Sequence, residues 1–253
     1  MFHASEHEEQ YFAQGPRPAQ YRPQFAICYL PRPGTPLATF GRSWFGRAND
    51  GTTRRAFSSN SLSGGTMSGT AHTPDRYLGL HAPFFSPLRL HGDAHMEDIK
   101  TRLHNFAGRR KPIETGPLVL AVERRALVLK PAEPRPELNW LALQCFNAFE
   151  AFASDDAVAD NDYPHLSAHQ RLLLKSFGQA NIMSEYRFAF ALTGPLPADR
   201  LGRIARALEP LIAGICASGI SVDGLSLVLS GDDGRHHQDT AATRLMGRYA
   251  LAA

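Results

Sequence analysis

The order of strand-like and helix-like segments is the feature that most constrains the fold of this chain. Short apolar runs such as FAICYL (25–30) are typical of buried strands, whereas apolar residues at every third or fourth position are typical of amphipathic helices. The predicted order is strand, helix, strand, helix, hairpin, helix, helix, strand, helix, strand, strand. Because strands and helices do not alternate regularly, this order favours an α+β protein with helices packed on antiparallel or mixed sheets.

Local signals give each predicted segment its ends. Thr35, Asp93 and Ser167 are predicted to cap the helices that follow them. Prolines inside the strand that continues to Leu90 are expected to break its pairing. The predicted strands span 25–30, 76–90, 118–122, 126–129, 185–192, 225–230 and 243–251, the last as a sheet edge. The predicted helices span 35–45, 93–110, 136–152, 167–177 and 197–218.

Composition excludes several classes of protein. The 253 residues are 43% hydrophobic, which is enough to bury a core in one large domain or two small lobes. A net charge of +3 without a basic run argues against specific nucleic-acid binding. The three cysteines are far apart and predict neither a disulfide framework nor a zinc site. This cysteine usage fits a reducing cytoplasm. No apolar stretch reaches the roughly 20 residues of a membrane span, so we expect no membrane association.

Two segments have the composition of surface chain. Residues 1–23 are rich in acidic residues and proline and are expected to form a loose tail. Residues 48–73 contain SLSGGTMSGT and are expected to form a flexible insertion. Without a GK[ST] motif, that insertion is not a phosphate-binding loop.

Clusters of histidine and acidic residues invite a metal-site interpretation, but solvated loops and helix caps are the favoured one. The stretch 155–169 lacks the glycine and the final glutamate of a calcium loop. We therefore predict no metal and no cofactor. The residues considered are Asp155, Asp156, Asp160, Asp162, His165 and His169 in that stretch; His91, Asp93 and His95; and Asp232, Asp233, His236 and His237.

His81 is the most informative single residue. A histidine on a strand beside a proline-induced kink can project into a cleft as an acid or base. Taken alone, a structural histidine with satisfied hydrogen bonds is the favoured interpretation. The chain has no GxSxG or HExxH motif that would indicate another chemistry.

Three blocks carry a resemblance to a known family. They are FAICYLPRPGTPLATFGRSWFGR (25–47), GLHAPFFSPLRL (79–90) and EYRFAFALTGPL (185–196). In order and separation they resemble the phosphonate-metabolism-associated branch of the two-histidine (2H) phosphoesterase superfamily. The resemblance implies one bilobal domain over residues 24–253, with two related lobes of antiparallel or mixed sheet and packed helices around a central cleft.

The resemblance also implies where the site lies and how it has changed. Each lobe of that family presents a His-x-Thr on a strand, one imidazole acting as base and the other as acid without a metal. Here His81 matches, but Pro83 stands in place of the first threonine. Ala189 replaces the second histidine and Ala191 the second threonine. His81 is therefore the one signature residue retained of four.

Strand alternation predicts the chemistry of the remaining cleft. Residues two apart on a strand share a face, so Arg187, Ala189, Ala191 and Thr193 are expected to point together into the cleft. Gly79 and His81 are expected to do the same, followed by Pro83 and Phe85 if the strand is unbroken. Arg187 and Thr193 are predicted to contact a small phosphorylated or partly apolar ligand. Thr193 lies one pleat, roughly 6.5 Å, beyond Ala191.

Four hypotheses follow. The first is a catalytically degenerate protein that binds a small ligand or partner in the cleft. The second is a reduced-activity, metal-independent phosphodiesterase acting on a small cyclic phosphate or ribose phosphate ester, with His81 as general base. The third is a structural or regulatory interaction protein whose insertion at 48–73 covers the cleft. In the fourth, His165 or His169 supplies the second imidazole. The sequence does not predict an oligomeric state.

Overall fold

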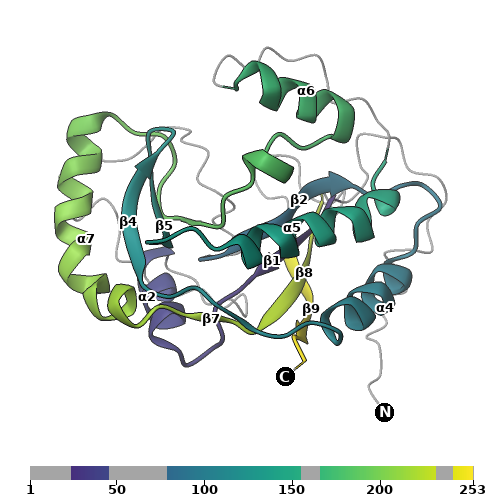
Figure 1. Cartoon of the computed structure of the whole chain (residues 1–253), viewed down its shortest axis with the longest axis horizontal. Helices are drawn as coiled ribbons and strands as arrows, with labels where there is room; N and C mark the ends of the chain where they lie inside the picture. The colour runs from purple at the N-terminus through teal and green to yellow at the C-terminus, as the bar shows by residue number, and fades with distance from the viewer. Residues whose placement is uncertain (1–23, 46–78, 155–165, 232–241, 253) are drawn as a thin grey trace.

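The structure, a computed structural model, describes residues 24–45, 79–154, 166–231 and 242–252. Helices pack on antiparallel sheets, and the predicted α+β class is confirmed (Figure 1). The expected tail at 1–23 and the expected insertion at 48–73 lie outside the described residues.

A four-stranded antiparallel sheet has the order β2 (Ala82–Arg89), β1 (Gln24–Tyr29), β8 (Gly224–Gly231), β9 (Ala242–Ala250). Strand β1 lies in its interior, and every residue of β1 after Gln24 is buried. A strand covered on both faces is apolar without alternation, which explains the run FAICY. The predicted edge position of the last strand is confirmed, because β9 pairs with β8 alone in this sheet.

A second sheet contains β4 (Leu118–Glu123), β5 (Ala126–Pro131) and the short β6 (Phe190–Ala191). The predicted hairpin is confirmed: Glu123 pairs with Ala126 across a two-residue turn formed by Arg124 and Arg125. A small two-stranded ladder joins β3 (Ile113–Glu114) to β7 (Ser221–Val222).

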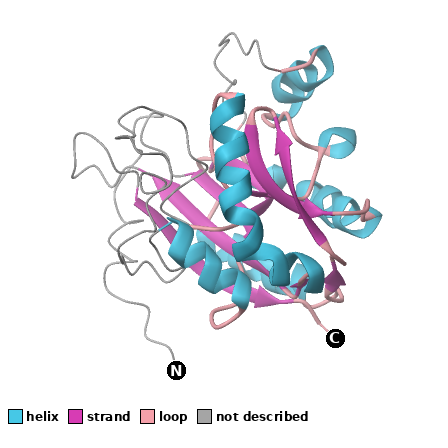
Figure 2. Ribbon diagram, turned by 90° about the vertical axis from the view of Figure 1, so that its left-hand side faces the viewer, coloured by secondary structure: helices cyan, strands magenta, loops and turns pink. Residues whose placement is uncertain are grey.

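The helices cover both sheets. Helix α5 (Pro136–Phe149) packs against β2, α4 (Met96–Ala107) against β8 and β9, and α7 (Ala198–Ser218) against β4. Figure 2 views the molecule from the α7 side, with helices in front of the strands. Two further helices are α2 (Pro36–Phe45), which contacts α7, and α6 (Ala168–Phe177). Residues from both larger sheets belong to one hydrophobic core cluster.

Two of the three predicted caps are confirmed. The Thr35 hydroxyl accepts a hydrogen bond from the Ala38 N–H at 3.3 Å, and Ser167 forms a capping box with Gln170. The Asp93 cap is wrong, because the helix begins at Met96 after His95. A turn closed by the Ala94 N–H and the His91 carbonyl occupies the residues before it.

The strand predicted at 185–192 is largely wrong. Residues Met183–Glu185 form a 3-10 helix, and only Phe190 and Ala191 pair with β5. The residues between them belong to no strand of the sheets described. Their burial still alternates, with Tyr186 and Phe188 buried and Arg187 exposed.

The proline break predicted near β2 takes the form of two irregularities in its pairing with β1. Ile27 pairs with Phe85 and the next residue, Cys28, with Pro83, so Phe84 is an extra residue on β2. Pro83 has no N–H to donate to a ladder, and prolines within sheets are found at such bulges and edges. As a result Phe84 and Phe85 are both buried while Pro83 is exposed. Phe85 is expected to follow His81 only on an unbroken strand, and with the pairing broken here it is buried in the core instead.

Candidate functional site

His81 lies immediately before β2 and is half-buried. Its Nδ1 lies 2.9 Å from the carbonyl oxygen of Gly79. A carbonyl only accepts, so Nδ1 carries the proton in this contact, and the lone pair of the neutral ring is on Nε2. Gly79 has φ of +73°, a conformation that glycine adopts without steric cost, and this turn directs its carbonyl toward the imidazole.

We call the two blocks around His81 (79–90) and Ala189 (185–196) the first and second motif segments, and the second has an exposed face. Arg187 is exposed, and Ala189 and Ala191 are partly exposed beside it. Arg187 Nη1 donates to the carbonyls of Ser184 at 2.7 Å and Tyr186 at 2.6 Å, so one end of the guanidinium is held by its own backbone. The methyl groups of the two alanines can neither move a proton nor hold a phosphate oxygen.

Thr193 does not continue this face. Its side chain is buried, and its hydroxyl accepts a hydrogen bond from the Leu127 N–H at 2.9 Å. The N–H groups of Leu192 and Thr193 both approach the Leu127 carbonyl, at 2.8 and 3.3 Å, which breaks the two-residue alternation after β6. The expectation that Thr193 shares the face of Arg187 is wrong, and its hydroxyl anchors β5 instead.

The two motif segments nevertheless lie against each other. Tyr186 donates its hydroxyl proton to the Pro83 carbonyl at 3.0 Å. The Phe84 ring lies 6.1 Å from the ring of Tyr186 and 5.5 Å from that of Phe188. Burial raises the pKa of Tyr186 well above its usual value, which keeps the hydroxyl protonated as a donor. We call Phe84, Tyr186 and Phe188 with the Pro83 carbonyl the aromatic seam.

A polar cluster forms where the second segment begins. His169 Nε2 on α6 lies 3.2 Å from the Ser184 hydroxyl, while Arg187 donates to the Ser184 carbonyl. We call His169, Ser184 and Arg187 the Ser184 cluster. His169 is one of the two histidines considered as the second imidazole, and Arg187 is the predicted anion contact. Both therefore contact the same residue, Ser184. The other histidine, His165, lies outside the described residues.

Comparison with protein families decides the membership of this chain. Residues 80–238 match the model of a family described as "Protein of unknown function (DUF1045)". The chain belongs to this DUF1045 family. That match includes His81, the aromatic seam and the Ser184 cluster.

Other similarities of the DUF1045 chain are more distant. A ribose 1,5-bisphosphate phosphokinase PhnN of Janthinobacterium sp. (strain Marseille) is 25% identical over 238 residues, which are 85% of this chain and 52% of that relative. The chain thus spans about half the length of the curated relative. A LigT of E. coli, crystallised with 3′-AMP, has a TM-score of 0.42 at 11% identity over 91% of this chain and 99% of its own. A crystal structure of a phosphoesterase has a TM-score of 0.40 at 12% identity, over 91% and 99%.

The other histidine and acidic groups of the DUF1045 chain do not form a metal centre where they are described. Within residues 24–45, 79–154, 166–231 and 242–252, no three His, Cys, Asp or Glu side chains are placed to hold an ion. His91 instead accepts from the Asp93 N–H at 3.3 Å. The acidic positions at 155–162 and the residues 232–237 lie outside the described part. In the part that is described, no helix combines the length and apolar character that crossing a membrane needs.

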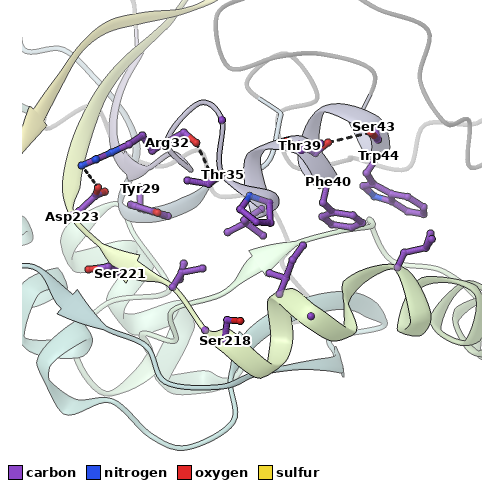
Figure 3. Close-up of a pocket in the computed structure, with 18 residues that line it drawn as sticks. Tyr29, Arg32, Thr35, Thr39, Phe40, Ser43, Trp44, Ser218, Ser221 and Asp223 are labelled. Atoms are coloured by element: carbon purple, nitrogen blue, oxygen red, sulfur yellow. Dashed lines mark hydrogen bonds and ion pairs between the residues drawn. The ribbon is translucent and has the colours of Figure 1, made fainter.

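A pocket between α2 and α7 was not predicted from the sequence. It has a volume of about 980 Å³ and lies beside the loop that joins β1 to α2. Figure 3 shows Arg32 and Asp223 at one end and Phe40 and Trp44 at the other. We call it the α2–α7 pocket. Its other lining residues are Tyr29, Gly34, Thr35, Pro36, Leu37, Thr39, Ser43, Leu211, Gly214, Ile215, Ser218, Gly219, Ile220 and Ser221.

The sequence contains a signal for half of this pocket. Phe40 and Trp44 are spaced as one face of a helix, and that helix is present as predicted. Helical spacing shows that a face is apolar but not that part of it stays uncovered. Asp223 is paired with both Arg32 and Arg248, and it lies 191 positions after Arg32 in the sequence. No local sequence pattern therefore predicts this group of charges.

Proposed function

We propose that this protein has the 2H phosphoesterase-like architecture and is catalytically degenerate, binding a small phosphorylated or partly apolar ligand on the face formed by His81, Arg187, Ala189 and Ala191. The observation that carries the proposal is that the two motif segments lie in contact while alanines stand at both chemical positions of the second. Removal of a general acid lowers a rate by about 10² to 10⁴. Loss of a positioned oxyanion contact lowers it by about 10² to 10³ more.

The distant similarity to a ribose 1,5-bisphosphate phosphokinase supports a ribose phosphate as the ligand class and a link to phosphonate metabolism. Arg187 supplies the charge for such an anion, since its guanidinium has five N–H donors and the backbone contacts use Nη1. We expect Arg187→Ala to weaken binding of ribose 5-phosphate by about tenfold, measured by calorimetry. Arg203→Ala is the matched control, because Arg203 is exposed on α7 and paired only along its own helix in the contacts described.

Hydrolysis assays test the degeneracy. The purified protein is incubated with 2′,3′-cyclic nucleotides and ribose cyclic phosphates in the presence of a chelator. No turnover above the His81→Ala variant is expected. In parallel, the triple variant Pro83→Thr, Ala189→His, Ala191→Thr restores the family signature, and a gain of turnover in it supports the assignment of the two segments. Wild-type turnover that His81→Ala abolishes overturns the degenerate function.

One observation favours a second candidate, a reduced-activity phosphodiesterase. The Ser184 cluster places an imidazole, His169, beside Arg187 on the second segment. With the Nδ1 proton held by Gly79, His81 would act as a base through Nε2, and His169 would supply the acid. This candidate requires that His81→Ala and His169→Ala each abolish turnover, while His95→Ala, an exposed histidine at the start of α4, leaves it unchanged.

A further inference from the structure

We propose that the α2–α7 pocket is a second binding site, which takes a small amphipathic anion with an aromatic or other apolar body and a phosphate or carboxylate head. The proposal does not depend on the function of the face around His81. It rests on a volume of about 980 Å³, which is the size of pockets that enclose small organic ligands.

The apolar half of the pocket is lined by aromatic side chains of α2 and aliphatic side chains of α7. Phe40 and Trp44 of α2 lie 6.3 Å apart between ring centres, nearly parallel, along one wall. Leu211 on the opposite wall is 59% exposed although it faces this lining. A Cβ atom at Gly214, one turn along α7, would meet no atom within 4 Å. Apolar surface of this kind gains free energy when a ligand covers it, at roughly 25 cal/mol for each Å² removed from water.

The polar half contains one carboxylate, Asp223, that is neutralised from two sides, by Arg32 in the pocket lining and by Arg248 outside it. Asp223 is ion-paired with Arg32 through Oδ2, and its Oδ1 accepts from Arg248 Nη2 at 2.7 Å. Two guanidinium groups thus surround one carboxylate. Because both carboxylate oxygens are already paired, an incoming cation would have to displace an arginine. An incoming anion would instead use further N–H groups of Arg32, whose side chain is 62% exposed.

The floor of the polar half is fixed. Tyr29 is buried, and burial followed by the charge of Asp223 raises its pKa to about 12, so its hydroxyl is neutral at physiological pH. Arg248 lies over the Tyr29 ring at 5.8 Å and donates to the Leu30 carbonyl at 2.6 Å. Arg248 is therefore held in place, and Arg32 is the cation that can adapt to a head group.

Helix dipoles do not change this balance. The first turn of α2 brings a positive helix end to the pocket, and the last turn of α7 brings a negative one. These opposite ends offset each other, so the side chains decide the sign of the preferred ligand.

The test uses three probes with the same ring system and different heads: 1-naphthyl phosphate, 1-naphthalenemethanol and 1-naphthalenemethylamine. The chain has two tryptophans, and the one outside the pocket, Trp140, is 61% exposed. In a Trp140→Phe background, quenching of fluorescence therefore reports on Trp44 alone. We expect the phosphate to bind at least tenfold more tightly than the alcohol and the amine to bind most weakly.

Two variants locate the site. Arg32→Gln is expected to reduce affinity for the phosphate by about tenfold and to leave the alcohol unchanged, since one charge-assisted contact is lost. Gly214→Leu is expected to fill the apolar half and abolish binding of all three probes, without a fall in melting temperature. Gly202→Leu is its matched control on the same helix, where a Cβ meets only the Arg206 side chain at 3.9 Å.

Five outcomes overturn the proposal, four of which concern differences between probes or variants. Those four are equal affinities for the three heads, an unchanged preference in Arg32→Gln, full binding in Gly214→Leu, and equal losses in Gly202→Leu and Gly214→Leu. Failure of all three probes to bind at millimolar concentration also overturns it. Hydrolysis results at the His81 face bear on none of these outcomes, so the two proposals fail separately.

Discussion

The aromatic seam and the α2–α7 pocket both join segments far apart in the sequence, but one is closed and the other open. In the seam, Phe84, Tyr186 and Phe188 are between 3% and 5% exposed. In the pocket, Leu211 is 59% exposed and the space beside Gly214 is empty. The residues of the seam alternate in sequence with the positions where the resemblance implies chemistry, whereas the pocket contains none of those positions.

The two regions therefore differ in the contacts that build them. Ala189 and Ala191 stand where the resemblance implies a histidine and a threonine, and the contact between the segments depends on their buried neighbours Tyr186 and Phe188. The pocket depends on charged residues near the ends of β1 and β8. The two regions are joined through the core, because Tyr29 of the pocket and Phe188 of the seam both pack on Phe190, with ring centres 6.0 and 5.5 Å from it. Substitutions at Arg32 test the pocket with the least effect on the seam, because Arg32 is exposed and lies away from this shared core.

Phe84→Ala should have the largest effect, because it opens the seam. Phe84 contacts both aromatic residues of the second segment and is 3% exposed. Truncation of a buried phenylalanine lowers the free energy of unfolding by about 3 to 5 kcal/mol. Urea titration followed by circular dichroism measures this loss, with Leu172→Ala, at a 60% exposed position, as the control near zero. A loss below about 1 kcal/mol would show that the seam does not hold the segments together.

Gly219→Ala, in the wall of the pocket, should lower the free energy of unfolding by about 3 kcal/mol. Gly219 has φ of +65°, and an added Cβ would lie 2.1 Å from the Gly116 carbonyl oxygen. Such backbone strain costs about 1 to 3 kcal/mol, and the clash with a backbone atom adds to it. Gly214→Ala, on the same wall but helical and unobstructed, should gain up to about 1 kcal/mol. Thermal denaturation should show a lower melting temperature for Gly219→Ala and an unchanged or higher one for Gly214→Ala. Equal melting temperatures of the two variants would contradict the clash at Gly219.

The sequence predicts the elements of this fold better than its faces. Helical periodicity and capping residues place α6 and α7 to within a residue or so, because these signals are local. The bulge at Phe84 depends on the pairing of β2 with β1. The inward orientation of Thr193 depends on hydrogen bonds to the Leu127 carbonyl. Neither partner is close in the sequence, so simple alternation assigns the wrong face to Phe85 and Thr193.

The candidate site shows the same limit. The motif resemblance locates His81, Ala189 and Ala191, and the structure places their segments in contact. The resemblance does not predict that Tyr186 donates to the Pro83 carbonyl or that His169 contacts Ser184. These contacts join residues 103 and 15 positions apart and require the three-dimensional packing.

Alkaline pH should reveal the contribution of Tyr29, on the floor of the pocket, to the free energy of unfolding. The pKa of Tyr29 is about 12 in the folded state and about 10 in an unfolded chain. Between these values the unfolded state has lost a proton that the folded state retains. Stability from Tyr29 is therefore complete below pH 10 and is lost as the pH rises toward 12, by about 2 to 3 kcal/mol in total.

Tyr29→Phe should remove that part of the pH dependence. Urea titrations at intervals from pH 9 to 12 measure the slope of unfolding free energy in both proteins. The difference should be about 1.4 kcal/mol per pH unit above pH 10. Below pH 9 the two slopes should coincide. If the variant keeps the full alkaline slope, other groups such as Tyr186, whose pKa is also raised, account for it.

The smallest effect should come from the turn that holds the second motif segment at both ends. Arg124 donates to Asn181 at 2.8 Å, and the Arg125 carbonyl accepts from Leu196 at 2.7 Å. Both arginines have positive φ, 48° and 63°, as the turn of a two-residue hairpin requires. A residue with a side chain costs about 1 to 2 kcal/mol there, and glycine avoids this cost but loses about 0.5 to 1 kcal/mol of chain entropy. Arg125→Gly should therefore stabilise the protein by about 0.5 to 1 kcal/mol in urea titration, whereas Arg125→Ala, which keeps the Cβ, should change little. Equal stability of the glycine and alanine variants would show that the turn is not strained.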